Sequence, residues 1–203
     1  YRHQFALMYP SLRDNEDYTA IINERQYDRL QGYLEDAREK GAELIEINPA
    51  NENLKDGTRK MPITLALKTT PDMKIMQDEI FGPILPIISY GNLDEAIHYI
   101  NDRPRPLALY FFGYDKSMQE HVVNQTHSGG MCINDALMHV AQDDLPFGGI
   151  GDSGMGHYHG KEGFLTFSHQ RSIFSKQQFH SGPLVYAPHG TPRHQMLYKL
   201  FIR

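Results

Sequence analysis

The fold class follows from residues 84–134, which read ILPIISYGNLDEAIHYINDRPRPLALYFFGYDKSMQEHVVNQTHSGGMCIN. Two nearly continuous apolar runs, at 84–90 and 107–112, are typical of strands buried on both faces of a sheet. A third, shorter apolar run at 131–134 predicts another strand. The intervals between these strands are long enough for one helix each.

Both intervals carry helix signals. Asn92 followed by Glu95 forms a capping box that opens a helix to about residue 100. Asp115 can cap a second helix, which the glycines after Ser128 would end. The order strand, helix, strand, helix, strand predicts an α/β fold with a mostly parallel sheet and flanking helices.

The N-terminal half fits the same class. Asn23 can cap a helix over about 26–40, with Gly41 as the stop. Its apolar side chains recur at spacings of three and four residues: Tyr27, Leu30, Leu34 and Ala37. Residues 42–47 and 63–68 are then predicted as strands.

The C-terminal part differs from the rest of the chain in its high glycine content. Residues 145–163 are too rich in glycine for a packed strand or helix, and glycine lets the backbone approach a ligand or another segment closely. One or two helical turns are predicted at 164–169 and a terminal strand at 172–175.

Composition narrows the class of partner. The 203 residues carry a net charge of −5, and all 25 acidic residues lie in 1–170. An acidic body argues against a general nucleic-acid binder. Residues 171–203 hold five basic residues and no acid. This tail is either merely solvated or contacts an anionic partner or membrane surface.

The chain contains neither a long apolar run nor a secretory signal pattern at its N-terminus, so a cytoplasmic location is expected. Its single cysteine rules out an internal disulfide framework.

Two glycine motifs imitate known sites. Residues 149–154 (GIGDSG) satisfy the dinucleotide-binding GxGxxG pattern, but no strand precedes them and no acidic residue follows about twenty positions on. Residues 151–154 resemble the surroundings of a serine-protease nucleophile, which the α/β pattern opposes. We reject both interpretations.

The single cysteine and the eleven histidines do not form a recognisable reactive or metal-binding motif. Cys132 lies between Met131 and Ile133 on a predicted strand, away from any helix N-terminus, which favours a buried structural cysteine. His157 and His159 lie in the glycine-rich stretch without further ligands at suitable spacing, so no metal is expected.

One constellation stands out, at 77–83 (QDEIFGP). A carboxylate at a turn can accept hydrogen bonds from both hydroxyls of a ribose, and a neighbouring aromatic ring can pack on a flat ring. Glu79 and Phe81 therefore suggest a nucleotide-contacting corner. A plain turn with a buried phenylalanine is the alternative.

The same residues carry a family resemblance. Residues 77–86 (QDEIFGPILP) resemble the EIFGPxLP segment of aldehyde dehydrogenases, and the match continues in order at 101–110 (NDRPRPLALY) and 128–135 (SGGMCIND). The stretch 145–160, with TFSH at 166–169, is similar to the class 3 branch, as is DYTAIINERQYDRL at 17–30. Within that branch the chain looks most like the bacterial coniferyl aldehyde dehydrogenases.

The resemblance implies an NAD- or NADP-dependent oxidation of an aldehyde, including coniferyl aldehyde, to its carboxylic acid. In that family a cysteine thiolate attacks the carbonyl, and a glutamate-activated water hydrolyses the resulting thioester. Both residues lie in motifs upstream of this region, so the resemblance makes the chain a C-terminal, catalytic-domain portion that is inactive alone. Cys132 does not match the nucleophile.

The resemblance also assigns roles. Glu79 would bind the nicotinamide ribose and Phe81 would pack near the nicotinamide, while Phe147, Val140 and His139 would line the aldehyde pocket. Residues 1–169 would form the catalytic-domain portion, 170–175 an oligomerisation strand of a homodimer, and 176–203 a basic tail. The alternative is a stand-alone α/β binding or assembly module without catalysis.

Overall fold

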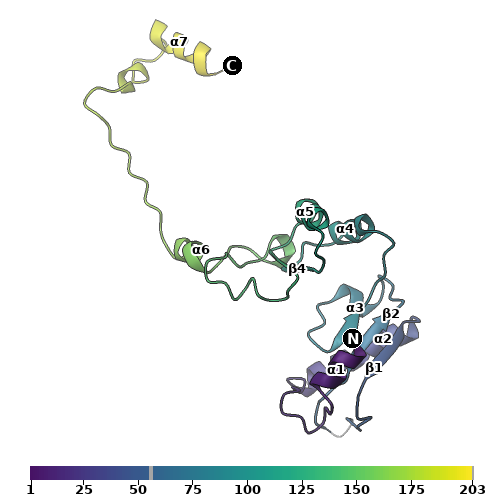
Figure 1. Ribbon diagram of the computed structural model, residues 1–203. Coiled ribbons are helices and arrows are strands. Elements are labelled where there is room, and N and C mark those ends of the chain that lie inside the picture. Colours follow the sequence, from purple (N-terminus) through teal and green to yellow (C-terminus); the bar gives the residue numbers. More distant parts are fainter. Residues whose placement is uncertain (55–56, 203) are drawn as a thin grey trace. The chain divides into compact units, whose positions relative to one another are not determined.

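The computed structural model describes residues 1–54 and 57–202, in two compact units, Tyr1–Ala96 and Ile97–Arg203 (Figure 1). The boundary falls within helix α4 (Leu93–Asn101). Helices and strands are interspersed along the described residues, and parallel strand pairs occur in both units, which confirms the α/β class predicted from 84–134.

The first unit contains a three-stranded sheet. Its strands are β1 (Glu43–Ile47), β2 (Ile63–Leu67) and β3 (Ile84–Pro86), in the order β1-β2-β3. The strand predictions at 42–47 and 63–68 are confirmed. β1 runs antiparallel to β2, whereas β3 runs parallel to it.

The prediction of a fully buried strand at 84–90 was wrong. Only the first three residues pair with β2, and the last hydrogen bond joins the Ile87 amide to the Ala66 carbonyl at 2.9 Å. Pro86 has no amide hydrogen to donate, and β3 is an edge strand of this sheet. Ile88 and Tyr90 are consequently 44% and 60% exposed.

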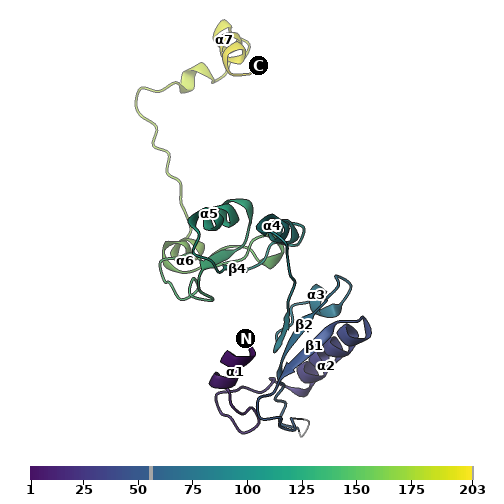
Figure 2. The same cartoon turned by 45° about the vertical axis from the view of Figure 1, so that its right-hand side comes forward.

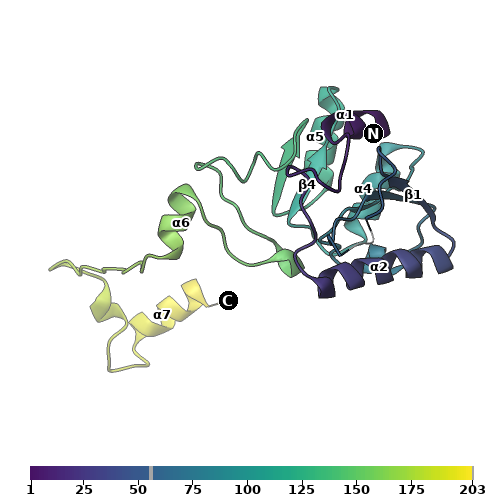
Figure 3. The same ribbon diagram turned by 90° about the horizontal axis from the view of Figure 1, so that it is seen from below.

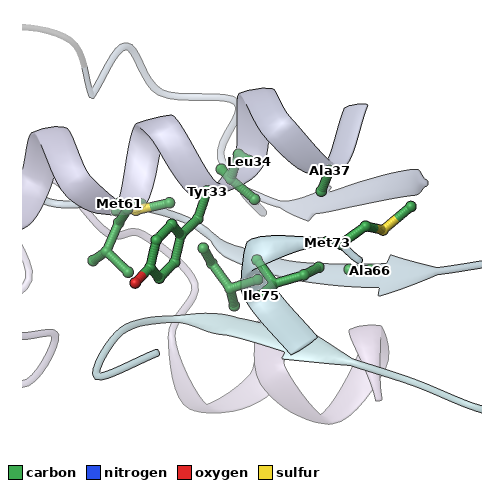
Figure 4. Packing of buried hydrophobic residues seen from close by; sticks show 9 residues of the cluster. Tyr33, Leu34, Ala37, Met61, Ala66, Met73 and Ile75 are labelled. Carbon is green, nitrogen blue, oxygen red and sulfur yellow. The ribbon is translucent and has the colours of Figure 1, made fainter. Parts of the chain in front are cut away.

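One face of this sheet is covered by α2 (Glu24–Glu39) and the short α3 (Lys74–Gln77). The side chain of Asn23 accepts a hydrogen bond from the Gln26 amide at 3.0 Å, as the capping pattern predicts. The cluster beneath α2, seen in Figure 4, consists of Leu30, Tyr33, Leu34, Ala37, Met61, Ala66, Met73, Ile75 and Ile84. Full burial of a side chain such as Leu30 contributes roughly 1.5–3 kcal/mol.

The opposite face packs on α1 (Arg2–Met8), a helix that the sequence analysis did not predict. Figure 2 shows α1 and α2 on opposite sides of the sheet. Because successive strand residues point to opposite faces, Ala66 joins the cluster under α2 while Leu65 joins the other. This second cluster consists of Phe5, Leu12, Ile47, Leu54 and Leu65.

The second unit contains the predicted strand–helix–strand element. β4 (Ala108–Phe111) and β5 (Gly130–Ile133) are parallel and joined through α5 (Lys116–Gln125). The Asp115 carboxylate accepts a hydrogen bond from the Met118 amide at 3.0 Å. At the end of the first unit, the Asn92 side chain accepts one from the Glu95 amide, also at 3.0 Å. Both predicted caps are confirmed.

The glycine-rich stretch packs against itself and against the start of β5. The Phe147 and Tyr158 backbones pair through two hydrogen bonds of 2.9 and 3.0 Å. A Cβ on Gly148 would lie 2.0 Å from the Gly156 carbonyl oxygen, and one on Gly129 would lie 2.3 Å from the Gly148 oxygen. Glycine is therefore required there by close backbone approach, as predicted.

The prediction that 145–163 forms no helix was wrong at two places. A 3-10 turn, η1, covers Gly151–Ser153, and α6 spans Gly160–Thr166 rather than 164–169. Glycine disfavours a helix interior by only about 1 kcal/mol, so Gly160 and Gly163 do not prevent this one.

The tail contains η2 (Gly182–Leu184) and α7 (Pro192–Phe201), and the residues between α6 and η2 form neither helix nor strand (Figure 3). The strand predicted at 172–175 is thus absent from the described single chain, where Phe174 is 91% exposed. A strand needs a partner strand for its backbone groups, and none pairs with it here. Within 1–54 and 57–202, no helix is long and apolar enough to cross a membrane.

Candidate functional site

The 78–83 corner, the turn that leads from α3 into β3, borders an open hollow of about 800 Å³. Glu79 and Phe81 both line this hollow, and the Phe81 side chain is 78% exposed. Phe81 also has a backbone φ of +49°, in the left-handed region that is uncommon for residues with a Cβ. The alternative interpretation expected a buried phenylalanine, and in this chain the Phe81 side chain is exposed instead.

Helix α2 holds this corner with three side chains. Arg29 Nη2 donates to the Ile80 carbonyl at 2.5 Å, and the Tyr33 hydroxyl donates to Asp78 Oδ2 at 2.7 Å. Leu30 packs so closely on Gly82 that a Cβ there would lie 2.5 Å from its Cδ1 atom. The corner is thus fixed along most of its length.

The facing wall of the hollow is the segment 18–23. Tyr18 anchors it through a hydrogen bond from its hydroxyl to the Met61 carbonyl at 2.5 Å. Burial, with smaller contributions from Tyr9 and Tyr1, raises the pKa of Tyr18 to about 12, so its hydroxyl stays protonated as the donor. Arg59 supports the same segment by donating from Nε to the Ile21 carbonyl at 3.0 Å.

The hollow combines a carboxylate with an exposed aromatic ring. A carboxylate accepts hydrogen bonds from neighbouring hydroxyls, and an aromatic face packs on a flat ring. Sequence reasoning found these two groups but missed Arg29 and Tyr33. The spacing of Gln26, Arg29 and Tyr33 by three and four residues places them on one helix face. This spacing was the sequence signal from which Arg29 and Tyr33 could have been identified.

The other predicted site residues lie in the second unit. His139 is buried, with its ring centroid 5.5 Å from that of Phe147 and 6.0 Å from that of Tyr110. Val140 follows it in the chain and is half-buried. The structure therefore brings His139 and Phe147 together, and brings Glu79 and Phe81 together in the first unit.

Cys132 lies in β5 and is buried, which confirms its predicted place on a strand. Its sulfur lies 3.1 Å from His139 Nδ1 and accepts a hydrogen bond from the His139 amide at 3.3 Å. The other ring nitrogen of His139, Nε2, is buried without a hydrogen-bond partner. Sequence reasoning missed this pairing because it depends on the turn after β5.

The histidines of the glycine-rich stretch do not converge. His157 is exposed, whereas the His159 ring packs edge-on against Tyr158 at 4.3 Å. In the part of the chain that the structure describes, no group of three or more His, Cys, Asp or Glu side chains could hold a metal ion.

Comparison with protein families and with curated proteins finds aldehyde dehydrogenases in both cases. Residues 4–173 match the model of the aldehyde dehydrogenase family. A probable coniferyl aldehyde dehydrogenase from Pseudomonas aeruginosa is 56% identical to this chain. The alignment covers the whole of this chain and 42% of that protein. The aldehyde dehydrogenase family 3 member A2 from Mus musculus is 45% identical. That alignment covers 82% of this chain and 32% of the mouse protein.

The solved structures that resemble this chain are aldehyde dehydrogenases as well. The substrate-bound state of Staphylococcus aureus AldH aligns with 99% of this chain and 42% of its own, at a TM-score of 0.77 and 38% identity. The NAD+ complex of Mycobacterium tuberculosis aldehyde dehydrogenase aligns with 79% of this chain and 32% of its own, at a TM-score of 0.68 and 31% identity.

The chain thus spans about two fifths of the length of the first curated relatives, with matches of 42%, 37% and 40%. The family model covers most of the chain, and its match includes the 78–83 corner as well as the glycine-rich stretch. This chain belongs to the aldehyde dehydrogenase family.

Proposed function

We propose that this chain is the C-terminal catalytic-domain portion of an NAD(P)-dependent aldehyde dehydrogenase that oxidises an aldehyde to its carboxylic acid. The observation that carries the proposal is the pairing of the Glu79 carboxylate and the exposed Phe81 ring on one hollow. Family membership and the NAD+ complex of a relative support it.

The residues of the 78–83 corner fit a nicotinamide nucleotide. Glu79 would accept hydrogen bonds from the nicotinamide ribose hydroxyls, and Phe81 would pack near the ring. A bound NAD(P)+ accepts the hydride that the aldehyde carbon loses. The part of this chain is to orient the coenzyme, and orientation is a large component of catalysis when two reacting groups must meet.

The aldehyde side of the proposal rests on the second unit. His139, Val140 and Phe147 would line the substrate pocket, and the contact between the His139 and Phe147 rings supports a shared aromatic wall. Coniferyl aldehyde is the proposed substrate, because relatives that are 56%, 52% and 50% identical carry that name. Its aromatic ring would pack well on such a wall.

The covalent step is assigned to residues outside this chain. In the full-length enzyme a cysteine thiolate would add to the aldehyde carbonyl, hydride loss would give a thioester, and activated water would release the acid and free the thiolate. We assign neither nucleophile nor general base to any residue of 1–203. Cys132 is buried on β5 beside His139, a setting that supports a packing role.

The proposal is tested by Glu79→Gln in the full-length enzyme. Glutamine preserves volume but removes the charge, and a hydrogen bond to a charged group is worth about 1.5–3 kcal/mol. We expect coenzyme affinity to fall roughly tenfold or more and hydride transfer to slow, with the thermal midpoint unchanged. Coenzyme titration and single-turnover kinetics measure both quantities.

The matched control is Glu35→Gln, which removes the same charge from an exposed position on α2. It should behave like the parent enzyme. If Glu79→Gln also binds and transfers hydride like the parent, the assignment of the 78–83 corner to the coenzyme is wrong.

A further inference from the structure

The Arg29 side chain reaches two consecutive peptide groups of the 78–83 corner. Its Nη2 atom donates to the Ile80 carbonyl at 2.5 Å, and Nη1 makes a longer contact of 3.5 Å with the Glu79 carbonyl. Since the guanidinium is planar and its donors form a rigid fork, these contacts fix the directions of both carbonyl groups.

Arg29 is itself held in place. Its Nε atom donates to Gln26 Oε1 at 2.7 Å, and its Cζ atom lies 4.9 Å from the centroid of the Tyr33 ring. The side chain is half-buried against α2. A long, flexible side chain that is restrained at both its stem and its head can define the position of what it contacts.

The corner needs such a restraint. Phe81 follows immediately after the two carbonyl groups and has a φ of +49°, a conformation that costs energy for any residue with a Cβ. Its ring is 78% exposed, so packing of the ring does not supply that energy. The conformation must be held from its flanks, where Arg29 acts before Phe81 and the Leu30–Gly82 contact acts after it.

We propose that Arg29 is a positioning residue that fixes the peptide groups of Glu79 and Ile80 and thereby aims the Glu79 carboxylate and the Phe81 ring into the hollow. It acts through the backbone of the corner rather than through contact with coenzyme. This inference rests on the proposed function for its consequence in coenzyme binding, but not for its effect on the corner itself.

Direct contact is the rival explanation, because Arg29 also lines the hollow and a coenzyme carries anionic phosphates. The two explanations differ for Arg29→Lys. Lysine keeps the charge but lacks the fork, so it restores direct attraction to an anion fully and restores the two carbonyl contacts only in part.

The experiment uses the full-length enzyme with Arg29→Met, Arg29→Lys and, as a control, Arg25→Met, which removes an exposed arginine from the same helix. Amide hydrogen exchange without coenzyme reports the corner directly. The amides to follow are the hydrogen-bonded ones at the two ends of the corner, Asp78 and Ile84, which donate to the Lys74 and Gly82 carbonyl groups. We expect exchange at these amides to become about tenfold faster in Arg29→Met, equivalent to roughly 1.4 kcal/mol, less so in Arg29→Lys, and unchanged in Arg25→Met.

Coenzyme affinity, measured by NADH and NADPH fluorescence titration, should follow the same order. Arg29→Met is expected to lose about tenfold and Arg29→Lys an intermediate amount, while KM for the aldehyde stays within about twofold of the parent. If Arg29→Met does not fold, the intermediate result for Arg29→Lys still carries the test.

The outcomes separate the two proposals. Unchanged exchange at the corner in both Arg29 variants overturns the positioning role, whether or not affinity falls. Loss of affinity in Arg29→Met with full recovery in Arg29→Lys and unchanged exchange identifies direct contact instead. Faster exchange together with unaltered coenzyme binding in Glu79→Gln leaves the positioning of the corner intact and removes the proposed function.

Discussion

At the scale of single residues, Cys132 illustrates how surroundings decide the role of a side chain. It is the single cysteine of the chain, it is buried on β5, and its sulfur contacts His139. A reactive thiolate needs exposure to substrate as well as a favourable charge environment. The buried position supports the assignment of Cys132 to packing.

We expect the purified 203-residue chain to produce no NADH or NADPH from an aldehyde, because covalent catalysis requires an accessible nucleophile. Absorbance of the reduced nicotinamide measures this. The matched variant Cys132→Ser in the full-length enzyme should retain aldehyde oxidation. Activity of the isolated chain that disappears in its Cys132→Ser variant would contradict the assignment.

The sequence identified the chemistry of individual residues better than their geometry. Glu79 and Phe81 stood out because a carboxylate and an aromatic ring flank a turn, and they do share one hollow. The left-handed backbone of Phe81 and the pairing of Cys132 with His139 were not predictable. Both depend on contacts between segments, which local sequence patterns do not encode.

At the scale of elements, two glycines of the chain should respond oppositely to the same substitution. Gly148→Ala would place a Cβ 2.0 Å from the Gly156 carbonyl oxygen, which forces two backbone segments apart. We expect a loss of roughly 1–3 kcal/mol, as for overpacked cores. Gly32→Ala, in the interior of α2 with nothing within 4 Å, should gain roughly 0.5–1 kcal/mol.

Urea unfolding of both variants and the parent measures this difference. The expected order of midpoints is Gly148→Ala, then the parent, then Gly32→Ala. A Gly148→Ala variant as stable as the parent would show that the glycine-rich stretch yields without cost, contrary to the close backbone contacts described above.

Elements with local signals were predicted well. Asn23, Asn92 and Asp115 each cap a helix through a hydrogen bond three residues away, so the sequence alone defines those starts. The length and burial of the strand predicted at 84–90 were overestimated, because both depend on neighbouring strands that the sequence does not specify. The four-residue α3 has too little periodicity to detect, while α7 was missed despite Pro192 at its first position.

At the scale of the whole molecule, exposed apolar side chains predict that the isolated chain self-associates. Ile173 and Phe174 are 76% and 91% exposed in the segment proposed as an oligomerisation strand. Backbone groups without a partner strand can pair with a second copy. We expect a dimer, detected by light scattering across a concentration series.

The control compares lysine substitutions at two exposed apolar positions. Phe174→Lys should weaken the dimer, because charge on an edge strand opposes pairing, whereas Met155→Lys, at a side chain 97% exposed outside that segment, should not. A mass near 23.3 kDa at every concentration for the parent chain would contradict the prediction.

Every residue that lines the hollow lies between Tyr18 and Pro83, inside the first compact unit. Domains generally fold as units, and the N-terminal one folds first during synthesis, at about 5–20 residues per second. All residues of the hollow have therefore been synthesised before Ile97, the first residue of the second unit. The remaining part of the chain, with His139 and Phe147, follows over roughly 5–20 s at that rate. Each newly made molecule therefore carries the residues proposed for the coenzyme, Glu79 and Phe81, before it carries those proposed for the aldehyde.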